Sequence, residues 1–168
     1  STRLCQGIEQ KDYLRWKIKA FPSIETKVSK SGYTGKENIY QTSQVPNFIL
    51  DDNPFNSVLN SLDKLGLAIW IMDDGFIDQA NRLIICSNSF TKEENEKLSI
   101  MLQKRFNTYS KVVSNGKGHY QLSVSRIEKD KLIDSIKDFI HPYFKKKWNT
   151  KTILNIQKSN LFLTVCLF

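Results

Sequence analysis

The chain has 168 residues, of which 40% are hydrophobic and 11% aromatic, so it can bury a core without disulfide staples. Its net charge of +8, from 25 basic and 17 acidic residues, favours a polyanionic partner such as nucleic acid. Three scattered cysteines and two histidines exclude a disulfide framework and a His-rich metal site, and no membrane segment or targeting peptide is visible. This pattern favours the reducing interior of a cell or of an organelle, a mitochondrion or a chloroplast.

The first third of the chain predicts a strand, a helix and a hairpin. Residues 3–8 favour a short strand, and residues 9–21 place apolar side chains at helical spacing until Pro22 ends the helix. Residues 24–30 and 38–45 are separated by glycines, and the first of them alternates apolar and polar side chains. We therefore expect them to pair as two antiparallel strands.

An uncharged run over residues 65–72 is the strongest signal in the chain. It is too short to cross a bilayer and predicts a buried helix that begins near residue 56 or 57. Gly66 and Ala68 are small enough to let a second backbone approach this helix closely. The spacing therefore predicts a partner helix against it.

Two carboxylates follow the run directly, as Asp73 and Asp74, before Gly75. At a helix C-terminus they meet the negative end of the helix dipole, which is unfavourable unless something offsets it. A divalent cation held by a carboxylate would do so, with Gly75 as a left-handed cap. The alternative from these residues alone is an ordinary core helix that ends in solvated aspartates.

The first elements recur after Gly75. Residues 82–88 predict a strand, and residues 91–106 predict a helix opened by a capping box of Thr91 and Glu94. Residues 109–114 and 119–126 then favour a second hairpin, followed by a final helix over residues 132–140. Because a helix precedes the second strand–helix–hairpin set, we expect the helix that opens the first set to be missing from this sequence.

Polar side chains on the hairpins are candidates for contact with nucleic acid. Period-two alternation puts the polar side chains of residues 121, 123 and 125 opposite apolar ones, and basic side chains flank them. The alternative is the ordinary polar face of a half-buried sheet. The candidates are Lys27, Gln41, Lys111, Lys117, Gln121, Ser123, Ser125 and Arg126.

Residues 67–75, LAIWIMDDG, resemble the motif of the LAGLIDADG homing endonucleases, in particular the second motif of a subfamily that reads LAIWYMDDG. The stretches NSFTKEE, GKGHYQLSVS and IHPYFKKKW are similar to the same subfamily. The resemblance implies an α/β (α+β) fold of repeated strand–helix–hairpin–helix units with a saddle-shaped antiparallel sheet. On this basis residues 1–55 are a partial first repeat, residues 56–150 the second and residues 151–168 a tail.

The resemblance also implies a Mg²⁺-dependent, sequence-specific double-strand DNA endonuclease. Asp74 would be the metal ligand, Lys147 a basic residue of the active site, and Asp73 and Gly75 supporting residues. In the family two such helices pack side by side, so a second helix is expected from a missing N-terminal segment or a second chain. The activity fits the residues, because metal-assisted phosphodiester hydrolysis needs no nucleophilic side chain.

The first repeat departs from the family pattern, since TSQVPNF follows its hairpin almost at once and Gln44 stands where a lysine is expected. Relatives that have lost cleavage keep nucleic-acid binding. The alternative function is therefore a non-catalytic RNA- or DNA-binding relative, such as an intron maturase or a ribonucleoprotein component, with structured RNA as its partner.

Overall fold

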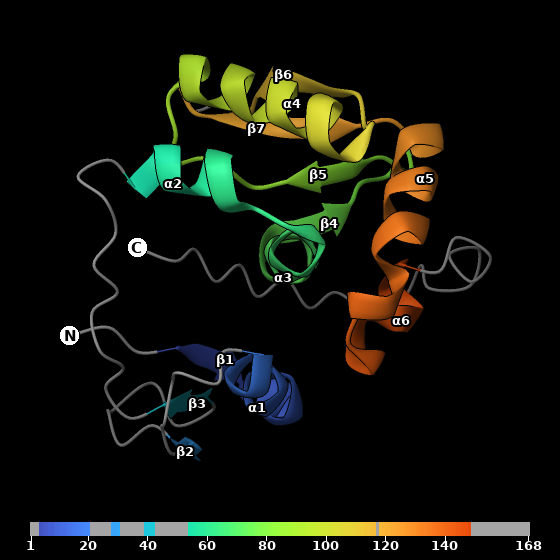
Figure 1. Cartoon of the computed structure of the whole chain (residues 1–168). Helices are drawn as coiled ribbons and strands as arrows, with labels where there is room; N and C mark the ends of the chain where they lie inside the picture. The colour runs from blue at the N-terminus through green and yellow to red at the C-terminus, as the bar shows by residue number, and fades with distance from the viewer. Residues whose placement is uncertain (1–3, 21–27, 31–38, 43–53, 117, 149–168) are drawn as a thin grey trace. The chain divides into compact units, whose positions relative to one another are not determined.

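The computed structural model describes residues 4–20, 28–30, 39–42, 54–116 and 118–148 (Figure 1). The chain divides into two compact units, Ser1–Asp52 and Asn53–Phe168. No helix of the described residues is long and apolar enough to cross a membrane.

The first unit is a three-stranded antiparallel sheet with one α-helix against it. Its elements are β1 (Cys5–Gly7), a short 3-10 helix η1 (Ile8–Gln10), α1 (Lys11–Ala20), β2 (Val28–Lys30) and β3 (Ile39–Thr42). The strand order is β1-β3-β2, with Gln6 opposite Tyr40. Helix α1 contacts β1 and β3, and Tyr13 and Leu14 are fully buried. The ammonium of Lys17, which is also buried, lies 5.0 Å from the Tyr13 ring centroid, so the ring face compensates the charge.

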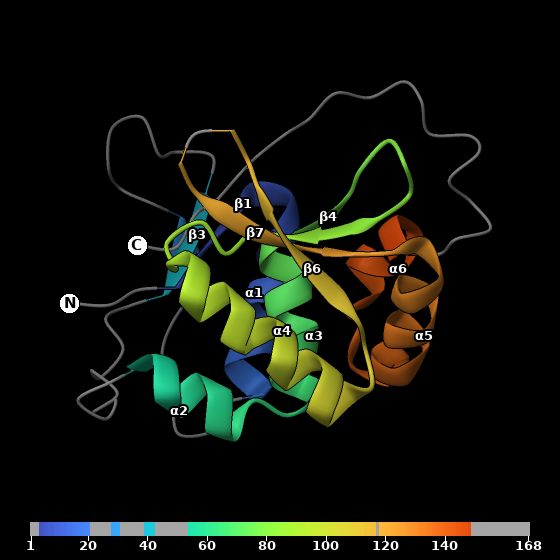
Figure 2. The same ribbon diagram turned by 90° about the horizontal axis from the view of Figure 1, so that it is seen from above.

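The second unit is a four-stranded antiparallel sheet covered by helices. Its elements are α2 (Pro54–Ser61), α3 (Lys64–Asp74), β4 (Gly75–Ile77), β5 (Leu83–Ile85), α4 (Lys92–Phe106), β6 (Ser110–Ser114), β7 (Tyr120–Val124), α5 (Arg126–Ile136), a 3-10 helix η2 (Lys137–Phe139) and α6 (Pro142–Trp148). The strand order is β4-β5-β7-β6. Figures 1 and 2 show α4 lying along β6 and β7, which it contacts.

Alternate residues of the second sheet form the core. Ile85 lies opposite Leu122, and Leu83 opposite Val124, so these four side chains share one face, and all are fully buried. Leu98 and Leu102 of α4 are fully buried as well. The other face of the sheet carries the side chains of the intervening residues, among them Lys111.

Both units pair their strands in the same way. In each, a strand precedes a helix and a hairpin, and that first strand pairs antiparallel with the last strand of the hairpin, as β1–β3 and β5–β7. The predicted α/β class and the strand–helix–hairpin repeat are confirmed.

Three expectations about boundaries are wrong. The helix expected from residue 56 or 57 is two helices, because Asp63 caps a new one and accepts a hydrogen bond from the Gly66 N–H at 2.8 Å. The helix expected to be final is followed by α6. The hairpin strand ends at Val124: Ser125 is the N-cap of α5, its hydroxyl accepting from the Glu128 N–H, and Arg126 is the first residue of that helix.

Candidate functional site

The carboxylate of Asp74 lies at a helix–strand junction. Asp74 is the last residue of α3, and β4 begins at the next residue. Its side chain is half-buried, and its carbonyl accepts a hydrogen bond from the Cys86 N–H at 2.9 Å. The junction is therefore fixed both to the helix and to the end of β5. Asp73, also half-buried, lies beside it at the helix end.

At this junction only glycine fits, because there is no room for a Cβ atom. Its φ of −92° and ψ of 146° are extended, so the expected left-handed cap is wrong. A Cβ added there would lie 2.4 Å from the Ile71 carbonyl oxygen and 3.2 Å from Cη2 of Trp148. The hydrogen atom of glycine lets α3 end and α6 approach at the same point.

Lys147 of α6 reaches the same junction. Its Nζ donates to the Gly75 carbonyl at 3.0 Å and lies 4.8 Å from the Trp148 ring centroid. The residue as a whole is exposed, but the hydrogen bond of its ammonium to that carbonyl is partly buried, and the indole lies beside it. Burial lowers the pKa of Lys147 below its usual value, and the electrostatic interaction with Cys86 acts in the opposite direction.

The structure thus brings Lys147 to the junction of Asp74 and Gly75, from which it is 72 residues distant in the sequence. Sequence reasoning missed Cys86 and Trp148, which complete the surroundings of the ammonium. Trp148 directly follows Lys147, and that adjacency was a signal. For Cys86 the sequence carries none, since its place depends on how β5 ends against α3.

The donor chemistry of this site fits a hard divalent cation in part. Asp74 offers carboxylate oxygens, and among the described residues no three His, Cys, Asp or Glu side chains gather into a metal site. Mg²⁺ commonly binds one or two carboxylates and completes its shell with water and substrate phosphates. The described residues therefore fit as one contributor to such a site.

The predicted nucleic-acid contacts of the second hairpin differ in exposure. Lys111 is exposed and lies opposite Ser123, while Gln121 is half-buried and lies opposite Val113. Ser123 is only 6% exposed, so the open position expected for it is wrong. Ser125 and Arg126 are exposed but belong to the start of α5.

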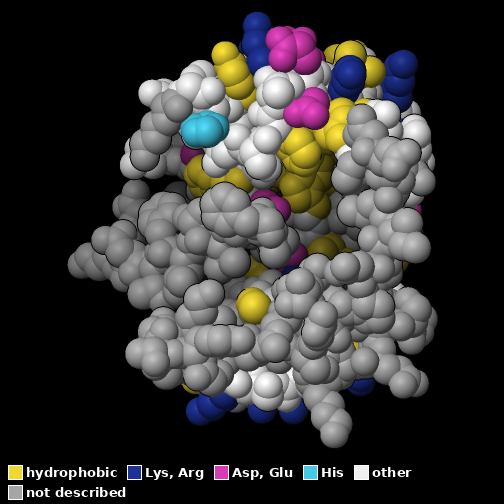
Figure 3. All heavy atoms as spheres, turned by 90° about the vertical axis from the view of Figure 1, so that its left-hand side faces the viewer, with side chains coloured by type: hydrophobic (Ala, Val, Ile, Leu, Met, Phe, Trp, Pro, Cys, Tyr) yellow, Lys and Arg dark blue, Asp and Glu magenta, His cyan; other side chains and the backbone are white. Residues whose placement is uncertain are grey.

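In the first hairpin, Gln41 pairs with Cys5 and Ser29 across the sheet. Lys27 and Lys117 lie outside the described residues. Figure 3 shows described Lys and Arg side chains at the upper edge of the face that it draws, beside acidic and apolar side chains.

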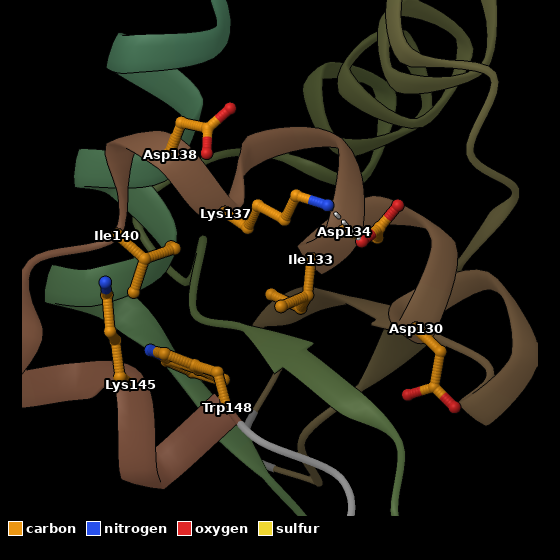
Figure 4. A pocket seen from close by; sticks show the side chains of 8 residues that line it. All are labelled: Asp130, Ile133, Asp134, Lys137, Asp138, Ile140, Lys145 and Trp148. Carbon is orange, nitrogen blue, oxygen red and sulfur yellow. Dashed lines mark hydrogen bonds and ion pairs between the residues drawn. The ribbon is translucent and has the colours of Figure 1, made fainter.

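A hollow of about 480 Å³ lies between α5, η2 and α6. Figure 4 shows Lys145 and Trp148 at one end and Asp130 at the other, with an ion pair between Asp134 and Lys137 at 3.0 Å. The full lining is Asp130, Ile133, Asp134, Lys137, Asp138, Ile140, Lys145 and Trp148. Trp148 lines this hollow and also lies beside Gly75.

Comparison with known proteins gives sequence matches of two kinds. The model of a family described as the LAGLIDADG DNA endonuclease family matches residues 54–132. A probable intron-encoded DNA endonuclease 3 of Mycosarcoma maydis is 32% identical over 92 residues, covering 54% of this chain and 67% of that protein. The cytochrome b mRNA maturase bI2 of Debaryomyces hansenii is 28% identical over 136 residues, covering 75% of this chain and 52% of that protein.

Solved structures agree in fold. The homing endonuclease I-WcaI, bound to its DNA recognition sequence, has a TM-score of 0.66 at 20% identity, covering 87% of this chain and 74% of that one. I-DmoI, in complex with DNA and Mn, has a TM-score of 0.50 at 16% identity, covering 80% and 79%. At these identities the likeness concerns the fold.

Proposed function

We propose that this chain, which belongs to the LAGLIDADG DNA endonuclease family, acts as a divalent-metal-dependent, sequence-specific double-strand DNA endonuclease of the homing type. The observation that carries the proposal is the ammonium of Lys147, held on the Gly75 carbonyl directly after Asp74. The carboxylate of Asp74 and the ammonium of Lys147 are thereby held at one junction. From residue types alone, only Asp74 could be predicted as a site residue.

Each residue has a part in phosphodiester hydrolysis. Asp74 would hold the cation through its carboxylate oxygens, with Mg²⁺ the expected ion. That cation would supply charge stabilisation at the phosphate and an activated water. Lys147 would supply a second positive charge near the phosphate, and burial lowers the pKa of its ammonium.

Cleavage of two strands needs a second acidic helix end beside Asp74. We propose that it comes from a segment preceding Ser1 or from a second copy of the chain, packed along α3. Ala68 and Leu67 of that helix are fully buried, whereas Gly66 accommodates Leu62, whose Cδ1 would lie 3.0 Å from an added Cβ. Residues 1–55 and 56–150 would then be the two repeats, with residues 151–168 as a tail.

An organelle genome is the proposed origin. The Mycosarcoma maydis relative is named as intron-encoded, and the Debaryomyces hansenii relative is named for cytochrome b mRNA. Both names fit a mobile intron of a mitochondrion or a chloroplast.

Replacement of Asp74 tests the endonuclease proposal. A target is first selected by cleavage from a randomised duplex library in Mg²⁺. Asp74→Asn keeps the shape of the side chain but removes its charge, so cleavage should fall by at least a hundredfold while duplex binding stays within about threefold. Asp134→Asn, on the exposed side of α5, is the matched control and should cleave normally. Normal cleavage by Asp74→Asn would overturn the assignment.

The second candidate function is RNA binding as a maturase. It is favoured by the bI2 relative, whose match covers 75% of this chain, more than the endonuclease match does. Competition between duplex DNA and a structured intron RNA for the same protein separates the two functions. Tighter binding to RNA favours the maturase. The major groove of an RNA helix is too narrow to admit these strands as duplex DNA does, so a protein that reads a DNA groove should prefer the duplex.

A further inference from the structure

His119 at the tip of the second hairpin is tied to the loop that follows β5. The hairpin tip is closed by a hydrogen bond from the Asn115 N–H to the His119 carbonyl at 3.0 Å. The Nδ1 of His119 lies 3.1 Å from the Asn88 carbonyl oxygen, and the Asn115 amide donates to the Asn88 side chain at 3.4 Å. Two residues of the tip therefore bind one residue of the loop.

The same loop is held by hydrogen bonds from the side-chain amide of Asn95, a fully buried residue of α4. That amide donates to the carbonyls of Phe90 at 3.1 Å and Thr91 at 2.9 Å. Its oxygen accepts from the Ser87 hydroxyl. The Asn88 carbonyl thus has a fixed position, set by a residue buried in the core.

A fixed carbonyl decides which ring nitrogen of His119 carries the proton. A carbonyl oxygen only accepts hydrogen bonds, so Nδ1 must be the donor. In the neutral imidazole the other nitrogen, Nε2, then has a free lone pair and can only accept. His119 is exposed, so this acceptor is available to a partner.

The position of His119 on the hairpin indicates which partner it meets. Side chains of one strand face recur at every second residue, and the hydrogen bond from the Asn115 N–H to the His119 carbonyl continues the pairing of β6 and β7. His119 therefore lies on the same face as Gln121, away from the buried side chain of Leu122. That is the side on which Lys111 is exposed and which, under the proposed function, faces the DNA. A phosphate also only accepts hydrogen bonds, so an Nε2 atom that carries no proton cannot bind one.

We infer that His119 is a base-reading residue that accepts a hydrogen bond from an exocyclic amino group, cytosine N4 or adenine N6, in the DNA major groove. These are the amino donors that the major groove presents. The inference rests on the proposed DNA contact of this hairpin. Asn95 is its positioning residue, because it holds the loop that fixes the tautomer.

The tautomer is tested without DNA. The chain has two histidines, so a His141→Gln variant of the full chain leaves His119 as the single imidazole. Long-range proton–nitrogen NMR spectra at pH 8, where an imidazole in water is neutral, should show the proton on Nδ1. Asn95→Ala should shift the spectrum towards a mixture of the two forms. A proton on Nε2 in the parent would overturn the inference.

Base reading is tested with the selected duplex and with His119→Ala. The variant should lose preference at one base pair, by about three- to tenfold for one hydrogen bond. Replacing the base there with purine or 2-pyrimidinone, which lack the amino group, should cause the same loss in the parent and none in the variant. The salt slope should not change, and Gln121→Ala, the matched control, should act at a different base pair.

Three outcomes of this test would overturn the inference. A reduced salt slope in His119→Ala would mean that the residue contacts phosphate. Equal loss from the amino-free base in parent and variant would mean that another group reads it. If the parent does not bind duplex DNA at all, base reading fails together with the proposed function, whereas the NMR result then still describes the tautomer.

Discussion

At the scale of single residues, Gly75 shows how the site is assembled. Its hydrogen occupies a position where a methyl group would lie 2.4 Å from a backbone oxygen of α3 and 3.2 Å from the Trp148 ring. The backbone oxygen cannot yield without lengthening the last turn of the helix. The constraint is one of packing, since the φ of Gly75 is open to any residue.

Gly75→Ala should therefore destabilise the protein by about 2 kcal/mol or more, as overpacked sites do. Urea titration of parent and variant measures the change in the unfolding free energy. Gly7→Ala is the control, because nothing lies within 4 Å of an added Cβ there, and it should cost nothing. Equal stability of parent and Gly75→Ala would contradict the packing account.

Lys147 makes the stability of the protein depend on alkaline pH. Because burial lowers the pKa of Lys147 in the folded state, the unfolded chain binds that proton more tightly. The unfolding free energy therefore rises as the pH increases from the folded pKa towards the usual value of 10.5. Lys147→Met should lack that rise and should also lose cleavage. Parallel stability profiles of parent and variant over this pH range would argue against burial of the ammonium.

Sequence and structure contribute differently to these residues. Asp74 could be predicted from its place after an uncharged run, because a carboxylate at a helix C-terminus needs a compensating group. Lys147 could not be separated from Lys145 by the sequence, since both belong to one basic run, and only the resemblance selected it. Cys86 could not be predicted at all, because its contact depends on tertiary packing.

At the scale of secondary-structure elements, helix caps determine which boundaries the sequence predicts correctly. Thr91 and Glu94 form the predicted capping box of α4, with both reciprocal hydrogen bonds present. Asp63 caps α3 through its side chain as well, but it lies within a longer helical pattern, so the sequence does not mark it as a helix start. Ser125 continues the alternation of β7, so the sequence pattern extended the strand past its end.

The corrected role of Ser125 gives a direct prediction. Its hydroxyl accepts from the Glu128 N–H, so Ser125→Ala should lower the unfolding free energy by about 1 kcal/mol. The duplex sequence that Ser125→Ala binds preferentially should be the same as the one that the parent protein prefers. Gln121→Ala is the converse control, with altered base preference and little change in stability. A changed preference in Ser125→Ala would restore this residue as a base contact.

At the scale of the whole molecule, the repeat was predictable but the strand order was not. The layout of strand, helix and hairpin recurs in the sequence, and both units show it. That β1 pairs with β3, and β5 with β7, depends on contacts between residues distant in the sequence. The order also determines which residues face outward, and it buries Ser123 between β5 and β6.

Lys111 tests whether the outward face of the second sheet contacts nucleic acid. If its ammonium neutralises one phosphate, Lys111→Ala should weaken binding to all duplexes alike and reduce the salt slope by about one unit. Lys92→Ala, at the start of α4, should leave the slope unchanged. The measurement is the dissociation constant over a range of salt concentrations. An unaltered slope in Lys111→Ala would move the phosphate contacts elsewhere.

Among the strands that the structure describes, the order β4-β5-β7-β6 leaves β4 and β6 as the edges of the second sheet. An edge strand offers unpaired backbone groups on which another chain can add a strand, the first step of aggregation. Here β4 is only three residues long, and β6 carries the exposed charge of Lys111. Both features oppose such addition, so the lysine proposed to meet a phosphate also keeps like chains apart while no nucleic acid is bound.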